Sequence, residues 1–225
     1  MLFRYFGQQA AWERKGFRFK MPIKLLDSTL VSLTISVYDW AHYTTSKGAV
    51  KMHTLLDYDC LLPEFMNITG GKRTDNKAAF DIEIKPHSIV VADRGYCDYG
   101  LLNHWDSNNV FYVGRHKDNI RYRTIEELPL PKQHTQNVLM DESIEFGLPA
   151  AKEKFPKRLK RIAVWNDEHG FVIELLTNNF TLAASTIAKL YKARWNIEIF
   201  FHNLKQLLRI KSFIGISRNA VETQI

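Results

Sequence analysis

The sequence is poor in cysteine and has no long apolar run. Its two cysteines, Cys60 and Cys97, do not form a CxxC pair. The absence of such a pair argues against a zinc site and against a disulfide-bonded scaffold. No apolar run reaches the roughly 20 residues of a membrane-spanning helix, and residues 1–20 lack the apolar core of a signal peptide. These absences favour a protein of a reducing, intracellular setting with no part in a membrane.

Acidic residues are also in the minority. The 225 residues include 24 Asp and Glu against 31 Lys and Arg, which gives a formal net charge of +7. A basic surface of this kind suits a polyanionic partner such as nucleic acid. The 45% hydrophobic content is ordinary for a globular protein, and a chain of this length can bury a large core.

Two aspartates follow short apolar runs. Asp27 comes after residues 23–26, and Asp93 closes the run SIVVA at residues 88–92. An aspartate at the carboxyl end of a buried strand is a common active-site or ligand position in α/β sheets. A turn or capping role is the alternative for both residues. Asp98, which follows the next turn, is predicted to cap a helix.

Residues 191–205, YKARWNIEIFFHNLK, contain no glycine or proline, and their apolar residues recur with helical spacing. We therefore predict one amphipathic helix here. At about 100° per residue, Tyr191, Arg194, Glu198 and Lys205 share one face, and apolar residues occupy the opposite face. A solvated face with an i,i+4 pair between Arg194 and Glu198 is the alternative.

The remaining patterns predict an α/β chain with a β-rich insertion. Turn residues GGKRTDNK lead into a short helix, for which Thr74 or Asp75 is the expected cap. Residues 116–176 hold four of the seven prolines and several short alternating segments, which are typical of strands. Further strands are predicted over residues 23–26, 30–37, 50–58, 60–69 and 110–113.

A basic run lies inside the predicted insertion. Residues 152–161 contain six Lys or Arg, among them Lys157 and Arg158, and Trp165 follows shortly after. Cations can neutralise phosphates and rings can stack on bases, so this run is predicted to follow a nucleic-acid backbone. A solvated charge run is the alternative for the cations, and a buried core position is the alternative for Trp165.

The spacing Tyr-x2-Arg-x3-Glu-x6-Lys resembles the signature helix of the insertion-sequence-four family of DDE transposases. Other strings resemble the same family: LLDSTLVSL, KGAVKMHTLLDYD, PEFMNITGGKRTDN and VVADRGYCDYGLL. The resemblance implies an RNase H-like mixed sheet flanked by helices, with a β-rich insertion before the last catalytic helix. The predicted parts are an N-terminal arm over 1–20, a catalytic core over 21–115 and 177–225, and the insertion over 116–176.

The resemblance also implies the chemistry. The family's catalytic, metal-binding acids fall on Asp27, Asp93 and Glu198. Carboxylate oxygens suit Mg²⁺, with Mn²⁺ as a substitute, and two such ions can assist phosphoryl transfer on DNA. The residues predicted to bind DNA are Tyr191, Arg194, Lys205, Lys157, Arg158 and Trp165, with Trp165 stacking on an unpaired base near the cleaved end.

The function implied is metal-dependent cleavage and strand transfer of an insertion sequence. The expected partner is double-stranded DNA, as transposon ends and as target, and the chain is expected to form a homodimer when assembled on it. The expected location is the bacterial cytoplasm, at the nucleoid. Asp27 comes early in the chain, so the sequence is expected to be a catalytic core or truncated copy. The alternatives are an RNase H-like DNA nuclease that cuts without joining and an inactive DNA-binding remnant.

Overall fold

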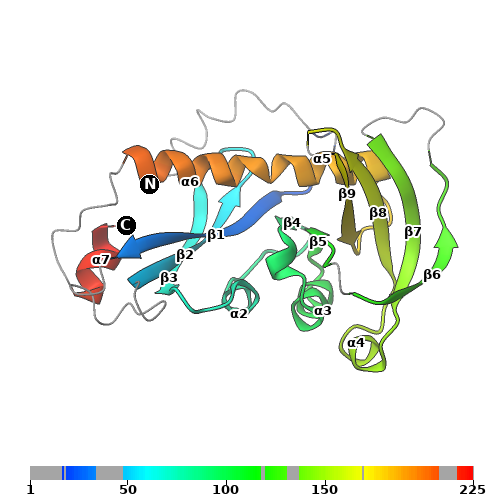
Figure 1. Cartoon of the computed structure of the whole chain (residues 1–225), viewed down its shortest axis with the longest axis horizontal. Coiled ribbons are helices and arrows are strands. Elements are labelled where there is room, and N and C mark those ends of the chain that lie inside the picture. Colours follow the sequence, from blue (N-terminus) through cyan, green and yellow to red (C-terminus); the bar gives the residue numbers. More distant parts are fainter. Residues whose placement is uncertain are drawn as a thin grey trace.

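A computed structural model describes residues 17, 19–33, 48–117, 120–130, 137–168, 170–207 and 217–224. The strands of these residues form one nine-stranded sheet in the order β3-β2-β1-β4-β5-β9-β8-β7-β6 (Figure 1). The strands are β1 (Ile23–Leu33), β2 (Gly48–Asp57), β3 (Pro63–Gly70), β4 (Ile89–Ala92), β5 (Phe111–Arg115), β6 (Tyr122–Glu127), β7 (Val138–Phe146), β8 (Leu159–Asn166) and β9 (Phe171–Thr177).

Helices cover both faces of this sheet. The helices α5 and α6 lie on one face, and α2, α3 and α4 lie on the other (Figure 1). Their bounds are α2 (Asp75–Ala79), α3 (Tyr99–Ser107), α4 (Pro149–Lys154), α5 (Ala184–Ala193), α6 (Trp195–Leu207) and α7 (Arg218–Gln224), with a 3-10 turn at Arg94–Tyr96. None of the described helices is long and apolar enough to cross a membrane. The mixed sheet with helices on both faces confirms the predicted α/β class.

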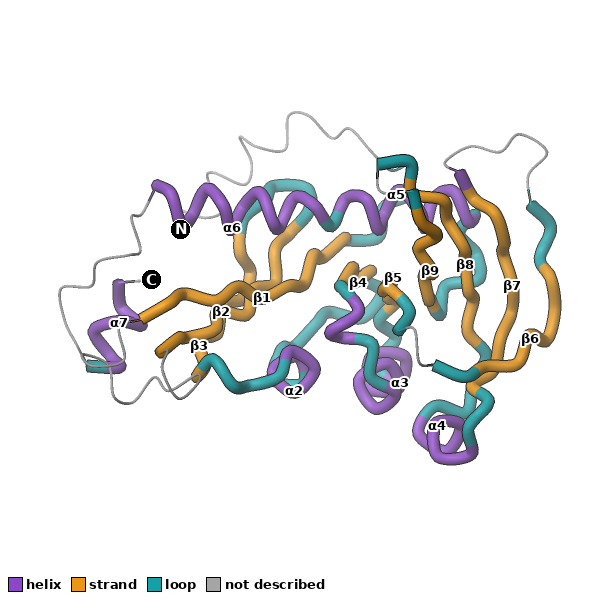
Figure 2. The backbone as a smooth tube through the Cα atoms, viewed as in Figure 1, coloured by secondary structure: helices purple, strands orange, loops and turns teal. Residues whose placement is uncertain are grey.

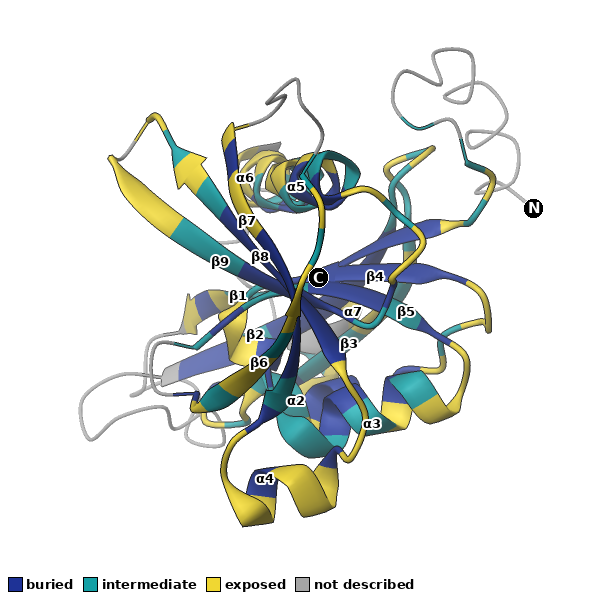
Figure 3. Cartoon of the chain, turned by 90° about the vertical axis from the view of Figure 1, so that its right-hand side faces the viewer, coloured by how far each residue is buried: buried dark blue, intermediate teal, exposed yellow. Residues whose placement is uncertain are grey.

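The centre of the sheet is mixed. Strand β1 is antiparallel to β2 and parallel to β4, and β4 is parallel to β5. All four residues of β4 are buried, as expected for a strand covered on both faces. Figure 3 shows β4 as a buried strand. The predicted strand at residues 88–92 is thus confirmed as an interior strand that ends directly before Asp93.

Two apolar cores result, one under each layer of helices. Side chains alternate along a strand, so Leu25 packs in the core under α5 and α6 while Leu26 packs in the core over α2 and α3. Ile187 of α5 and Ile197 of α6 are fully buried in the first core. This packing holds α6 across β1 (Figure 2).

Strand β1 differs from its prediction. Residues 23–33 form one continuous strand, with Asp27 opposite Thr54 of β2, where two strands separated at Asp27 were expected. The reason lies in the two partners of β1. Pairing with β4 stops at Leu26, opposite Ala92, whereas β2 continues to pair up to residue 33. Residues 34–37 of the predicted second strand lie outside the described residues.

The predicted helix at residues 191–205 is divided. Helix α5 ends at Ala193 and α6 begins at Trp195, so Arg194 forms the turn between them. The amide of Arg194 donates to the carbonyl of Tyr191 at 3.1 Å, and the amide of Ile197 donates to the carbonyl of Arg194 at 3.0 Å. Both are the i,i+3 bonds of a tighter turn. The divided helix nevertheless follows nearly one direction (Figure 2).

Strands β6 to β9 extend the sheet beyond β5. Strand β9 is antiparallel to β5, and β8, β7 and β6 follow in an antiparallel series. Helix α4, which the sequence pattern did not predict, lies between β7 and β8. The boundaries predicted for an arm, a core and an insertion stay predictions, and most of the arm, residues 1–16 and 18, lies outside the described residues.

The helix α6 offers a matched pair for testing this packing. Ile197 is 0% exposed, whereas Ile199 on the same helix is 47% exposed. Ile197→Ala should lower the free energy of unfolding by about 2–5 kcal/mol, because it leaves a cavity in the core. Ile199→Ala should change it by no more than about 0.5 kcal/mol. Urea unfolding measures both, and equal losses would contradict the assigned orientation of α6.

Candidate functional site

The three predicted acids come from three different elements. Asp27 lies within β1, Asp93 follows the end of β4, and Glu198 lies in the first turn of α6. Leu26 and Ala92 are partners in the parallel pairing of β1 with β4, so Asp27 lies beside Asp93, which directly follows the end of β4. Leu25 and Val91, two residues earlier, pack under α5 and α6. Alternation therefore directs both aspartates toward the face that carries Glu198.

Arg194 and Tyr191 connect these acids. The Arg194 Nη1 lies 3.4 Å from Oδ2 of Asp27, and its Nη2 lies 2.7 Å from Oε1 of Glu198. The Tyr191 hydroxyl donates to Oδ1 of Asp93 at 3.0 Å. The guanidinium carbon lies 5.6 Å from the centre of the Tyr191 ring, within the range of a cation–π contact. The expected Arg194–Glu198 pair is present, but Asp27, distant in sequence, shares the same cation.

The site has an excess of negative charge in a half-buried setting. Burial raises the pKa of Asp27 to about 6, and the charges of Asp93 and Glu198 act in the same direction. A hydrogen bond from the Ser28 amide, at 2.8 Å, and the charge of Arg194 oppose this rise. Burial disfavours the charged form of Arg194, but neighbouring Tyr191 and the three carboxylates raise its pKa overall. The site thus requires positive charge, which Arg194 supplies in part.

Tyr191 is a neutral donor. Burial raises its pKa well above the ordinary value for tyrosine, and the negative charge of Asp93 adds to the effect. The phenol therefore keeps its proton at neutral pH and donates it to the Asp93 carboxylate. This contact fixes one side of the Asp93 side chain from the last turns of α5.

The chemistry of these donors fits a divalent cation, since hard carboxylate oxygens are what Mg²⁺ and similar ions take. Their present arrangement does not. Across the described residues, no group of three or more His, Cys, Asp or Glu side chains is placed so that it could hold a metal ion. The Arg194 guanidinium instead bridges Asp27 and Glu198. The carboxylates lie near one another, and the Arg194 guanidinium lies between Asp27 and Glu198.

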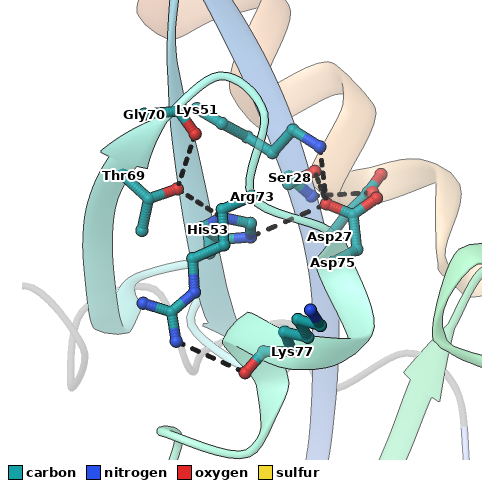
Figure 4. Close-up of polar contacts among 9 residues, drawn as sticks. All are labelled: Asp27, Ser28, Lys51, His53, Thr69, Gly70, Arg73, Asp75 and Lys77. Atoms are coloured by element: carbon teal, nitrogen blue, oxygen red, sulfur yellow. Dashed lines mark hydrogen bonds and ion pairs between the residues drawn. The ribbon is translucent and has the colours of Figure 1, made fainter. Parts of the chain in front are cut away.

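A second polar cluster lies beside Asp27 and was missed from the sequence (Figure 4). Asp75, the first residue of α2, accepts a hydrogen bond of 2.6 Å from the Ser28 hydroxyl and pairs with Lys51 Nζ at 3.2 Å. The amide of the same Ser28 donates to Asp27. Asp75 therefore fixes the residue next to Asp27 from the opposite face of the sheet.

His53 extends this cluster into β3. Its Nε2 lies 2.9 Å from the Thr69 hydroxyl, and its Nδ1 lies 3.7 Å from Oδ1 of Asp75. The sequence pattern offered Thr74 or Asp75 as the cap of α2. In the structure Thr74 occupies the cap position without a side-chain hydrogen bond, and Asp75 turns to Ser28 instead.

A signal for this cluster was present in β2. Lys51 and His53 alternate with apolar residues in a strand whose neighbours are buried. Two polar side chains on one face of an interior strand need polar partners, and β1 supplies Ser28 directly opposite His53. Asp75 could not be found in this way, because its position depends on the path of the chain from β3 to α2.

Comparison with known proteins agrees with this geometry. The sequence profile of the transposase DDE domain matches residues 18–225. The chain belongs to this family. Membership implies a general dependence on divalent metal, and the predicted resemblance to insertion-sequence transposases is confirmed.

Two relatives of this DDE domain carry transposase names. A protein of Geobacillus stearothermophilus, named as the probable transposase for insertion sequence element IS5377, is 29% identical over 212 residues, or 94% of this chain and 55% of its own length. Transposase y4zB of Sinorhizobium fredii is 31% identical over 205 residues, or 90% of this chain and 57% of its own length. The chain thus spans little more than half the length of either relative.

A solved structure shares the fold of the DDE domain. The piggyBac transposase, determined by cryo-EM as a synaptic complex with hairpin DNA, has a TM-score of 0.50 and 11% sequence identity. The match covers 90% of this chain and 44% of the other. At this identity the likeness concerns the fold, and it confirms the predicted RNase H-like sheet.

The predicted DNA contacts of the DDE domain do not all gather at the acids. Lys205 lies in the last turn of α6, two turns from Glu198, and partial burial lowers its pKa. Trp165 is 40% exposed near the end of β8. Its neighbour Val164 packs in the core under α5 and α6, so Trp165 faces the other side of the sheet. The structure does not bring Trp165 together with the three acids.

The basic run divides into buried and exposed parts. Lys160 pairs with Asp141 at 3.1 Å, and Arg161 pairs with Glu142 at 2.9 Å, all of them buried. The prediction that the whole run follows DNA is therefore wrong for Lys160 and Arg161, which neutralise buried carboxylates.

Two members of the run stay at the surface. Lys157 is exposed and pairs with Asp106, and Arg158 is exposed and lies 3.6 Å from Glu145. Strand β8 runs parallel to β5, since each is antiparallel to β9. Lys157 and Arg158 precede β8, whereas Asp93 follows β4, which runs in the same direction. The two basic residues thus lie at the opposite end of the strands from Asp93.

His53 predicts a pH dependence of stability. It is 1% exposed, and burial lowers its pKa to about 4, although the charge of Asp75 opposes this. The unfolded chain binds a proton near the ordinary pKa of about 6.5, while the folded chain does not. Stability should therefore fall as the pH drops from about 6.5 to 4, by at most about 1.4 kcal/mol per pH unit.

Urea unfolding at pH 7 and pH 5 measures this effect. The His53→Gln variant should lose less stability between these two pH values than the unchanged chain. The change at exposed His87, His87→Asn, should follow the unchanged chain. Asp27 titrates in all three proteins and cancels in the comparison. Parallel pH profiles for the unchanged chain and His53→Gln would show that His53 is not held neutral.

Proposed function

We propose that this chain is the catalytic core of a DNA transposase that cleaves DNA strands of an insertion sequence and joins them to a target. One observation carries the proposal. Asp27, Asp93 and Glu198 are 66 and 105 residues apart in sequence, yet Arg194 and Tyr191 connect all three. Binding of DNA alone does not require three gathered carboxylates. A metal-dependent phosphoryl transfer does.

In this proposal Asp27, Asp93 and Glu198 hold divalent metal, with Mg²⁺ as the natural ion and Mn²⁺ as a substitute. When bound, the metal supplies activation of the attacking oxygen and stabilisation of the leaving oxygen. The protein itself positions the acids from rigid strands and one helix, and Ser28 steadies Asp27 through its amide. Neutral Tyr191 orients Asp93.

Arg194 is the proposed phosphate contact nearest the reacting bond. Its planar guanidinium can take two oxygens of one phosphate, which a lysine cannot do. Lys205, on the same helix, is placed to contact DNA farther along. The proposed partner is double-stranded DNA, both transposon ends and target, bound by a homodimer at the bacterial nucleoid. The names of the relatives and of the piggyBac complex support DNA as the partner.

The triad can be tested by charge-removing changes of similar shape. Asp27→Asn, Asp93→Asn and Glu198→Gln should each lower the rate of Mg²⁺-dependent cleavage of an end-containing duplex by at least about a hundredfold. Even changes to groups that merely support metal ligands often cost 10–100-fold. Duplex binding, measured by fluorescence anisotropy, should stay within a few-fold. Glu83→Gln, at an exposed acid, is the control.

The same assay separates the candidate functions. A transposase core should both cut the end and join it to a second duplex, whereas a nuclease of the same fold should only cut. A chain that binds the duplex but does neither with Mg²⁺ or Mn²⁺ would be the inactive remnant. Near-normal cleavage by Glu198→Gln would contradict the assignment of the triad.

Lys157 and Arg158 are proposed to contact DNA away from the cleaved bond, because they lie at the opposite edge of the sheet. Replacing both by glutamine should weaken binding of a duplex of about 30 base pairs and lower its salt dependence by one or two phosphate contacts. Binding of a duplex of about 10 base pairs should not change. Equal weakening for both lengths would place these residues beside the acids, against the strand order.

We also propose that exposed Trp165 can stack on an unpaired base. Aromatic stacking of this kind tolerates any sequence. Since Trp165 faces away from the side of the sheet that carries the acids, such a base would have to pass around the end of β8. The exposed ring supports the contact, and its direction argues for a base outside the immediate reaction centre.

A further inference from the structure

The Arg194 guanidinium takes the position that a metal ion between Asp27 and Glu198 would need. Its two terminal nitrogens contact Asp27 and Glu198, and its side chain is only 14% exposed. Arginine cannot lose its proton in proteins, so the guanidinium remains a cation at any working pH. A metal ion that shares these carboxylates would lie beside a like charge at short range, with little water to screen it. The two cations therefore compete for the same oxygens.

The guanidinium is not fully satisfied in this position. Its Nε is buried and finds no hydrogen-bond partner among the described residues. Its contact with Asp27, at 3.4 Å, is longer than a strong charge-assisted hydrogen bond. A phosphate can accept from Nε and a terminal nitrogen together. A DNA phosphate thus offers Arg194 a second position that restores the missing hydrogen bond.

The position of Arg194 in the chain allows its guanidinium to move from the carboxylates to a phosphate without a change in the neighbouring backbone bonds. Arg194 forms the turn between α5 and α6, and Asn196 donates to the neighbouring Ala193 carbonyl at 2.7 Å. This bond and the two backbone bonds of the turn do not involve the Arg194 side chain. The guanidinium can therefore leave the carboxylates for a phosphate by side-chain rotation, without breaking these bonds.

We infer that Arg194 couples metal binding to DNA binding. In the free chain it holds Asp27 and Glu198 and keeps metal affinity low; a DNA phosphate draws it away and frees both carboxylates. This inference rests on the proposed function. By linkage, metal must raise DNA affinity by the same factor as DNA raises metal affinity, and couplings of this kind are typically about 5–150-fold. The device would restrict a metal-loaded site to chains that already hold DNA.

The test measures Mn²⁺ binding to the whole chain by the loss of the free-ion EPR signal. Titrations are made with and without a short duplex, and the signal lost to duplex alone is subtracted. The unchanged chain should bind Mn²⁺ weakly, and the duplex should strengthen binding by about tenfold, within the usual range of coupling. Arg194→Gln without DNA should already bind Mn²⁺ about tenfold more tightly than the unchanged chain, and the duplex should add little.

Two further variants make the result specific. Arg194→Lys keeps the charge, and a lysine can bridge two carboxylates, as Lys24 does with Asp57 and Glu64, so it should bind Mn²⁺ weakly without DNA, like the unchanged chain. If Arg194→Lys instead binds Mn²⁺ as tightly as Arg194→Gln does, a positive charge beside the acids does not keep metal affinity low, and the inference is overturned. Arg123→Gln removes an exposed arginine that pairs with Glu145, and should change nothing. Circular dichroism checks that each variant is folded.

Failure of the inference and failure of the proposed function give different results. If Arg194→Gln and the unchanged chain bind Mn²⁺ equally without DNA, or the duplex strengthens binding equally in both, Arg194 does not couple the two sites. If Glu198→Gln keeps the Mn²⁺ site of the unchanged chain, the ion binds elsewhere and the triad assignment itself is wrong. Tighter binding that Glu198→Gln abolishes supports both.

Discussion

The site depends on one partly buried cation, which is shared between a strand and a helix. Arg194 joins Asp27 of β1 to Glu198 of α6. Removing charges from water is costly, and an ion pair in a protein interior offsets that cost only when its geometry is good. Here two carboxylates contact one guanidinium, and the Tyr191 hydroxyl donates to the third carboxylate, that of Asp93. Without Arg194 the acids would repel one another, and without the acids a partly buried Arg194 would lose its ion pairs.

The fold supplies the distances that this interaction needs. Parallel pairing of β1 with β4 places Asp27 beside Asp93, which follows the end of β4, on the same face of the sheet. The apolar side of α5 and α6 fixes the height of Glu198 above that face. On the other face, Asp75 and Ser28 hold the strand next to Asp27. The carboxylates are therefore set by sheet register and core packing, while the side chain between them remains free to change partners.

The sequence predicts much of this when the signal is local. The capping of α3 by Asp98 is confirmed by hydrogen bonds to the amides of Gly100 and Leu101. The interior strand before Asp93 is also confirmed. It could be predicted because a short run rich in β-branched residues is typical of a buried strand. The family assignment rested on the spacing within residues 191–205, and the profile match confirms it.

What the sequence could not predict depends on contacts between distant segments. Strand β1 continues past Asp27 because it pairs with β2. The local sequence of β1 does not predict this continuation. Lys160 and Arg161 have the composition of a DNA-binding run, yet the acids of β7 bury them. The turn at Arg194 was not predicted either, because the sequence around it contains no glycine or proline. For β1 and for the basic run, a tertiary partner decided the outcome against the local pattern.

The most direct measurement is a crystal structure of the chain with a short duplex and Mn²⁺, with anomalous diffraction data to locate the ion. The account predicts an anomalous peak bounded by Asp27, Asp93 and Glu198, with the Arg194 guanidinium on a DNA phosphate. A DNA-bound structure without manganese at these acids, or with Arg194 still bridging Asp27 and Glu198, would contradict it.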